Sequence, residues 1–110
     1  MDTVTLPEMQ SEYDVLNLTY RYGVRVDDWA LTGGVDHESG LYKLALNQYP
    51  PSGPTYRTSM FAVEPPGGSV DLDGYAARLA HAHGIPEPAW LAPSLREIVR
   101  RLDADWNRSV

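Results

Sequence analysis

The chain contains no cysteine, one phenylalanine, one lysine and no long apolar run. Without thiols it forms neither disulfides nor thiolate metal sites, and a reducing compartment is expected. Its apolar stretches are too short to cross a bilayer. Its first residues lack the basic and apolar regions of a signal peptide. We therefore expect a soluble, cytoplasmic protein with no membrane partner.

Positive charge is also scarce, because nine basic residues stand against fifteen acidic ones and give a net charge of −6. Such a field repels phosphate backbones, so general binding to nucleic acid is not expected. It favours solubility or a basic partner. The preference for arginine over lysine, with abundant alanine, glycine and proline, indicates a GC-rich bacterial or bacteriophage genome.

The first half of the chain alternates apolar and polar residues. Between Asp14 and Asp27 the even positions from Leu16 to Val26 are aliphatic residues and tyrosines, which predicts a strand over this stretch with one buried face. Residues 1–12 show no sustained period and are expected to form a loosely ordered lead-in. Further strands are expected at about 29–32, 41–49 and 55–64, with proline-rich stops after the last two.

The second half changes to a helical period. An apolar stripe from Leu72 to His83 predicts a helix that Asp71 caps and Gly84 ends. A second helix is expected from the capping box at Ser94 to about residue 107. Strands followed by helices predict one α+β domain over residues 1–110. Its sheet has three or four antiparallel strands, with two C-terminal helices packed on one face.

One candidate metal site is the pair His81 and His83. On a helix, two steps turn the side chains by roughly 200°, so the two rings point nearly opposite ways. His83 is instead expected to pack near the helix end, with His81 in solvent. The segment Asp71–Gly74 lacks essential oxygens of a calcium loop. We therefore predict no metal and no cofactor.

The polar loop from Gly33 to Gly40 contains Asp36, His37 and Glu38. These residue types supply an acid, a base and metal ligands, so a small enzyme site is one interpretation if His81 approaches them. The alternative is an ordinary solvated turn. No partner spacing in the sequence favours catalysis.

A further alternative is DNA binding. The segment from Leu79 to Pro86, followed by Leu95 and Arg96, resembles the first helix and turn of a helix-turn-helix. The recognition helix would cover residues 87–96, where Pro93 interrupts it. The acidity of the chain also opposes contact with DNA.

The first 70 residues carry four basic side chains, and all of them fall at odd positions of predicted strands. They are Arg21, Arg25, Lys43 and Arg57. The odd positions of the first two strands oppose the apolar face, so these residues predict a basic patch on the uncovered side of the sheet. Arg57 joins this patch only if Tyr56 faces inward, which would also expose Phe61. The alternative is an ordinary solvated sheet face.

From these patterns we predict a small acidic, non-catalytic protein-interaction module of the adaptor, inhibitor or immunity type. The expected binding residues are Arg21, Arg25, Lys43, Arg57 and Phe61 on the uncovered sheet face. An exposed edge strand that pairs with a partner or with a second copy is the other expected binding element.

Overall fold

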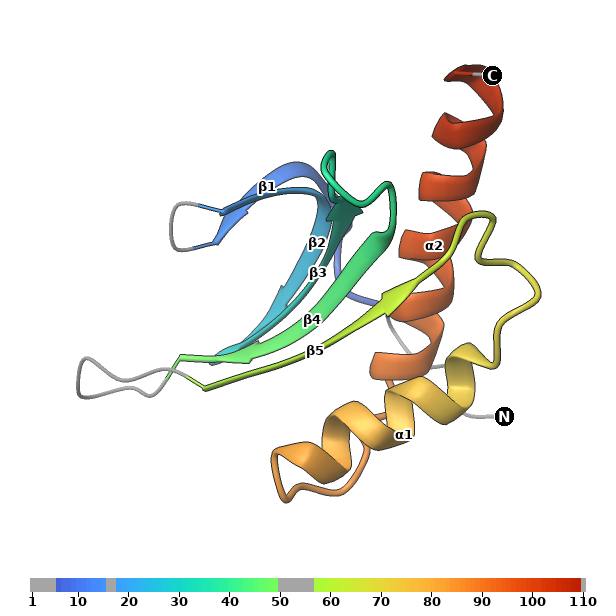
Figure 1. Ribbon diagram of the computed structural model, residues 1–110. Helices are drawn as coiled ribbons and strands as arrows, with labels where there is room; N and C mark the ends of the chain where they lie inside the picture. Colours follow the sequence, from blue (N-terminus) through green and yellow to red (C-terminus); the bar gives the residue numbers. More distant parts are fainter. Residues whose placement is uncertain (1–5, 16–17, 50–56, 110) are drawn as a thin grey trace.

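The computed structural model describes residues 6–15, 18–49 and 57–109. These residues form a five-stranded antiparallel sheet in the order β1-β2-β3-β4-β5, followed by two helices that lie on one face of the sheet (Figure 1). The predicted α+β class and the placement of the helices are confirmed. The prediction of three or four strands is wrong by at least one strand.

Each strand pairs antiparallel with the next in the chain, as in a meander. The elements are β1 (Gln10–Val15), β2 (Leu18–Val26), β3 (Trp29–Val35), β4 (Tyr42–Gln48) and β5 (Arg57–Val63).

The predicted single strand from Asp14 to Asp27 is two strands. The chain reverses between β1 and β2, and Tyr13 pairs with Tyr20 across the hairpin. Residues 10–12 therefore belong to a strand and not to a loose lead-in. The predicted inward positions Leu16, Leu18 and Tyr20 lie outside the residues whose side chains the structure describes. Further along β2 the predicted alternation holds: Val24 is fully buried, whereas Arg21 and Arg25 are exposed.

The core lies between the sheet and the helices. Leu31 of β3 and Leu44 of β4 are fully buried with Ile98 and Leu102. Gly33 lies among them, and a Cβ on this residue would be 2.4 Å from Ile98 Cγ2. Only glycine allows the second helix to approach β3 this closely, so this position fixes the spacing of the two layers.

The first helix, α1 (Leu72–Ala82), has the predicted ends. The Asp71 side chain accepts a hydrogen bond from the Gly74 amide at 3.1 Å, and Gly84 adopts a φ of +69° after the helix. This conformation favours glycine because a side chain would be strained there. The apolar stripe of α1 is buried, and so is His83, the residue that follows the helix.

The second helix, α2 (Leu91–Ser109), begins three residues before the predicted capping box. Pro93 lies in its first turn, where a missing amide costs nothing because no intrahelical acceptor is available. The Ser94 hydroxyl is buried without a partner, and Glu97 binds arginines instead of the backbone. The predicted capping box is therefore wrong. Among the described residues, neither helix is long and apolar enough to span a membrane.

Candidate functional site

The predicted binding residues do not form one patch. Arg25 and Lys43 lie on the sheet face opposite the helices, but both have local partners. The Arg25 Nε donates to the Asp27 carbonyl at 3.1 Å, and its guanidinium lies 4.8 Å from the Tyr49 ring centre. The Lys43 Nζ is 4.0 Å from a carboxylate oxygen of Asp36.

Phe61 and Arg57 lie on the other face of the sheet. The Phe61 ring stacks on Tyr75 of α1 with 4.2 Å between the ring centres, and Val63 on the same side is buried. Arg57 shares this parity in β5, so its strand position faces the helices. The condition set on Tyr56 falls outside the described residues. The geometric basis for including Arg57 and Phe61 in an open-face patch is therefore lost.

Arg21 points toward α2. The alternation of β2 places Arg21 on the face away from the core. Its Nε nevertheless lies 2.7 Å from a carboxylate oxygen of Asp105. Only Arg25 and Lys43 of the five predicted residues remain on the uncovered face. Between them lie mostly small residues that are themselves buried, such as Ala30 and Ala45.

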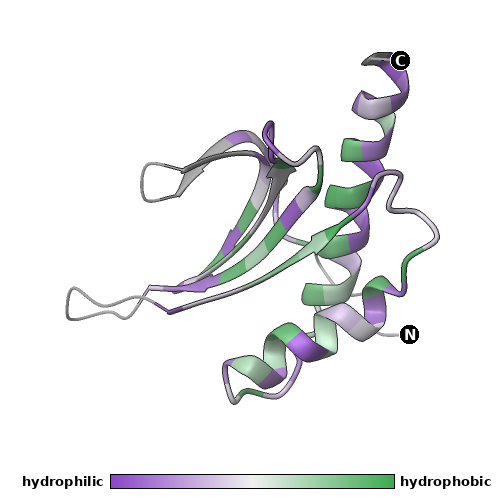
Figure 2. Ribbon diagram, viewed as in Figure 1, coloured by the Kyte–Doolittle hydropathy of each residue, from purple (hydrophilic) through white to green (hydrophobic). Residues whose placement is uncertain are grey.

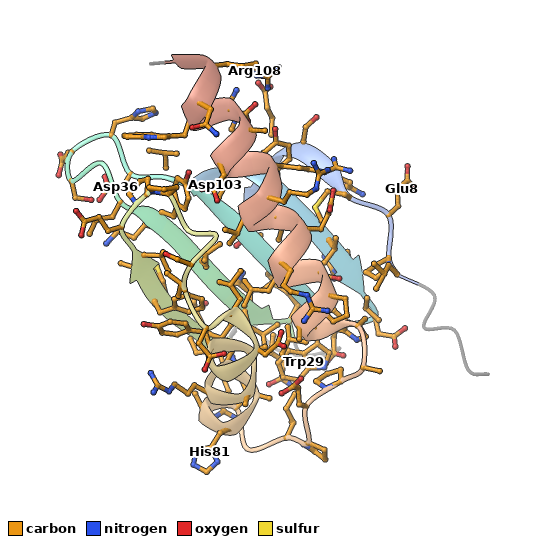
Figure 3. The ribbon with its side chains drawn as sticks, turned by 90° about the vertical axis from the view of Figure 1, so that its right-hand side faces the viewer. Glu8, Trp29, Asp36, His81, Asp103 and Arg108 are labelled. Carbon is orange, nitrogen blue, oxygen red and sulfur yellow. The ribbon has the colours of Figure 1, made fainter. Side chains whose placement is uncertain are left out.

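The alternative enzyme site is not assembled. The loop after β3 is a turn in which the Asp36 carboxylate accepts from the Ser39 hydroxyl at 2.9 Å and from the Glu38 amide at 3.1 Å. These bonds lower the pKa of Asp36. His37 and Glu38 are exposed in the same turn. Figure 3 shows Asp36 and His81 toward opposite ends of the molecule, so His81 supplies no base to this loop.

His81 of α1 and His83, the C-cap residue after this helix, have different surroundings, as predicted. His81 is exposed, whereas His83 is buried with its Nε2 3.0 Å from the Leu46 carbonyl and its ring edge-on to Trp29. The carbonyl only accepts, so Nε2 carries the hydrogen. No group of three or more His, Cys, Asp or Glu side chains in the described ranges is arranged to hold a metal ion.

The recognition helix of the DNA-binding alternative is not formed as a separate element. Residues 83–90 connect the two helices, and α2 begins at Leu91. Leu91 and Leu95 are fully buried in the core, so the first turns of α2 are held against the sheet.

The structure instead gathers arginines on the flank of α2 that faces β2. Three of them come from α2 and one from β2, and their side chains are between 37% and 75% exposed. Figure 2 shows that the side of α2 away from the core is strongly hydrophilic. We call this region the arginine surface; it consists of Arg21, Arg100, Arg101 and Arg108 around Tyr22, Glu97 and Asp105.

Helical spacing explains why these side chains meet. Glu97, Arg101, Asp105 and Arg108 follow one another at steps of three or four residues, so they lie along one face of α2. Arg100 directly precedes Arg101 in the sequence and lies beside this row on the helix surface. A shallow hollow runs along it, and its lining residues are Arg100, Arg101, Arg108, Tyr22, Ala104 and Asp105. The lining is therefore partly apolar and partly cationic.

Asp105 joins the helix to β2. Its carboxylate accepts the Tyr22 hydroxyl at 2.6 Å and also binds Arg21 and Arg108. Burial raises the pKa of Tyr22, and the bond to Asp105 adds to this effect. The pKa of Asp105 is lowered, first by the Tyr22 hydroxyl and then by Arg108. The carboxylate is therefore ionised at neutral pH.

Glu97 has a similar role about two turns nearer the start of α2. Its carboxylate accepts from the Arg100 Nε and the Arg101 Nε, both at 2.9 Å, and these bonds lower its pKa to about 2. The Arg101 guanidinium also lies 5.7 Å from the centre of the Tyr22 ring. Within the arginine surface as defined above, two carboxylates compensate four guanidinium groups, which leaves two positive charges in excess on an acidic protein.

Sequence reasoning missed this surface, although one signal was present. Arg100, Arg101 and Arg108 lie on the polar side of an amphipathic helix whose apolar stripe was used only to predict packing. The contribution of Arg21 depends on which strand lies beside α2, and no local pattern shows this. In comparisons with known proteins, no family model, no curated protein and no solved structure matches this chain.

Proposed function

We propose that this chain is a small, non-catalytic protein-interaction module that binds an acidic segment of a partner protein at the arginine surface. The observation that carries the proposal is the collection of four partly exposed guanidinium groups, three of which line a hollow, on a chain with a net charge of −6. The rest of the acidic surface repels such a segment, so binding is directed to this one region.

The geometry suits carboxylates. A guanidinium presents a planar fork of donors that matches a carboxylate, and Glu97 and Asp105 occupy only some of the donors of their arginines. A partner carboxylate can therefore bind the outward-facing donors without first displacing Glu97 or Asp105. Tyr22 and Ala104, which also line the hollow, supply apolar contact beside the arginines.

A protein segment fits better than nucleic acid. Glu97 and Asp105 remain ionised within the arginine surface, and they repel closely spaced phosphates. A peptide spaces its charges more widely and can place an apolar residue over Tyr22. Complementary charge then accelerates encounter, and the apolar contact slows dissociation.

The test uses a glutamate-rich peptide as the probe and two doubly substituted proteins with the same change in charge. Arg100→Glu/Arg108→Glu reverses the arginine surface, and Arg25→Glu/Lys43→Glu reverses the open sheet face. We expect titration calorimetry to show a loss of affinity of about tenfold or more for the first variant, and less than about twofold for the second. Binding by the wild type should weaken as salt is added.

Equal affinities of the two variants for the peptide would contradict the proposal. A loss of affinity in Arg25→Glu/Lys43→Glu alone would show that the peptide binds at the open sheet face instead. A short DNA duplex is titrated in parallel. If it binds more tightly than the peptide at the same salt concentration, the partner class is wrong.

A further inference from the structure

One edge of the sheet carries no charge along most of its length. Within the described ranges β5 pairs only with β4, so its outer edge has no strand partner. From Thr58 to Val63 the sequence contains no charged residue, and Figure 2 shows β5 in pale to green colours beyond its first residue. An unpaired row of amides and carbonyls on such a strand favours pairing with another extended strand.

The opposite edge is protected. β1 contains Glu12 and Asp14, and Glu12 adopts a positive φ of 54°, which interrupts the regular extended backbone. Charges and backbone irregularities of this kind are the usual devices that prevent sheets from joining edge to edge. The same sheet therefore has one closed edge and one open edge.

The middle of β5 also carries an exposed apolar side chain. Met60 is 55% exposed, the largest fraction among the large hydrophobic residues that the structure describes. It lies on the face away from α1, between the exposed residues Thr58 and Ala62. The other face of the strand is covered where Phe61 stacks on Tyr75.

We propose that β5 pairs antiparallel with β5 of a second copy of this chain, about a two-fold axis beside Met60. A two-fold axis perpendicular to the sheet keeps each side chain on its own face. Two residues that pair across the axis must therefore both have odd numbers or both have even numbers. Met60 is the midpoint of Arg57–Val63, so pairing centred on Met60 is the one register that uses the whole strand. Thr58 then lies opposite Ala62 of the second copy, and the two Met60 side chains cover each other.

A second copy is the occupant because this arrangement is self-complementary. Directly opposed Cβ atoms in an antiparallel pair lie about 4.5–5.5 Å apart, within contact distance for two methionines. The central residues of β5 carry no charge that would select a different, charged strand. Pairing joins the two five-stranded sheets into one continuous sheet and removes the open edge from both copies.

This inference is independent of the proposed function, and salt distinguishes the two. Two copies that each carry a charge of −6 repel, so added salt should strengthen self-association. Binding of an acidic segment to the arginine surface should weaken under the same conditions. The two surfaces share no residue.

The experiment is sedimentation equilibrium of the full chain over a wide range of concentrations. We expect the wild type to reach twice the monomer mass. Met60→Lys and Met60→Glu each place like charges at the axis, so each alone should raise the dimer dissociation constant by about tenfold or more. An equimolar mixture of the two variants places opposite charges there and should recover the dimer.

Asn107→Lys adds the same charge at an exposed position near the end of α2 and should leave the dimer intact. Circular dichroism checks that the Met60 variants fold, as expected for a change at an exposed side chain. A wild type that stays monomeric at every concentration overturns the proposal. So does a dimer that both Met60 variants leave intact, or a mixture that does not recover association.

Discussion

Asp103 and Asp105 lie two residues apart on α2, and each accepts a tyrosine hydroxyl from the sheet. The Tyr42 hydroxyl donates to Asp103 at 2.7 Å, and the Tyr22 hydroxyl donates to Asp105 at 2.6 Å. The remaining partners differ. Asp103 also accepts the buried Gly67 amide at 2.8 Å, whereas Asp105 binds two exposed arginines.

This difference separates a structural contact from a surface that is available to a partner. Asp103 ties the loop after β5 and a core tyrosine to α2, and Figure 3 shows it on the flank of the helix where that loop passes. Asp105 holds guanidinium groups whose outer donors face solvent. Two residues along a helix turn the side chain by roughly 200°, so one helix presents a sealed flank and an open flank.

The largest effect is expected from Asp103→Ala. The substitution leaves the Tyr42 hydroxyl and the Gly67 amide without their acceptor, and Tyr42 is fully buried. Each buried donor left unpaired costs about 1–3 kcal/mol, so the free energy of unfolding should fall by about 3 kcal/mol.

Urea denaturation measures this loss, and peptide binding at the arginine surface should not change. A loss of stability below about 1 kcal/mol would show that another acceptor serves Tyr42, and that Asp103 is not the main tie between the loop and α2.

Asp105→Ala is expected to lower the stability less than Asp103→Ala does, and to strengthen peptide binding. Tyr22 is half-buried and both arginines are exposed, so water can accept some of the hydrogen bonds that Asp105 accepts in the wild type. The free energy of unfolding should therefore fall by about 1 kcal/mol. Removing a carboxylate also raises the positive charge of the arginine surface. Affinity for the glutamate-rich peptide should therefore rise on the order of threefold.

Denaturation and calorimetry on the same protein measure both quantities. If Asp105→Ala weakens peptide binding, Asp105 is needed to position Arg21 and Arg108, and their positioning then outweighs the gain in positive charge. If it destabilises the protein as much as Asp103→Ala does, the proposed contrast between the two flanks fails.

Sequence patterns predicted the elements whose burial repeats along the chain. The stripe of α1, the cap at Asp71 and the turn at Gly84 were predictable because each depends on neighbours within a few residues. The reversal before Leu18 was not, because no glycine or proline marks it and the alternation that continues through β2 already begins at Leu16.

The candidate site was less predictable than the fold. Tyr22 and Asp105 are 83 positions apart in the sequence, and their contact, like that of Arg21, depends on the packing of α2 beside β2. Phe61 illustrates the opposite error. Both faces of β5 carry apolar residues, so its parity could not be assigned until the position of Tyr75 was known.

The smallest effect on stability is expected from lowering the pH, and it arises at Glu97 on the open flank. Arg100 and Arg101 lower the pKa of Glu97 from its ordinary value of 4.5 to about 2. Between these values the unfolded chain takes up a proton that the folded chain does not, so Glu97 stabilises the protein above this window. Its contribution is lost as the pH falls through it. Because the ion pairs are partly exposed, the contribution should not exceed about 1 kcal/mol.

Denaturation midpoints measured from about pH 5 down to about pH 2 test this expectation. Glu97→Gln should flatten the fall in stability over that range, whereas Glu87→Gln removes a carboxyl from the exposed connector and should not flatten it. Because the pKa of Asp105 is also lowered, the stability of the Glu97→Gln protein should still fall somewhat with pH at the acid end of this range. Parallel curves for the wild type and Glu97→Gln would mean that the arginines do not hold Glu97 in solution. The arginine surface would then carry more free positive charge than the structure shows.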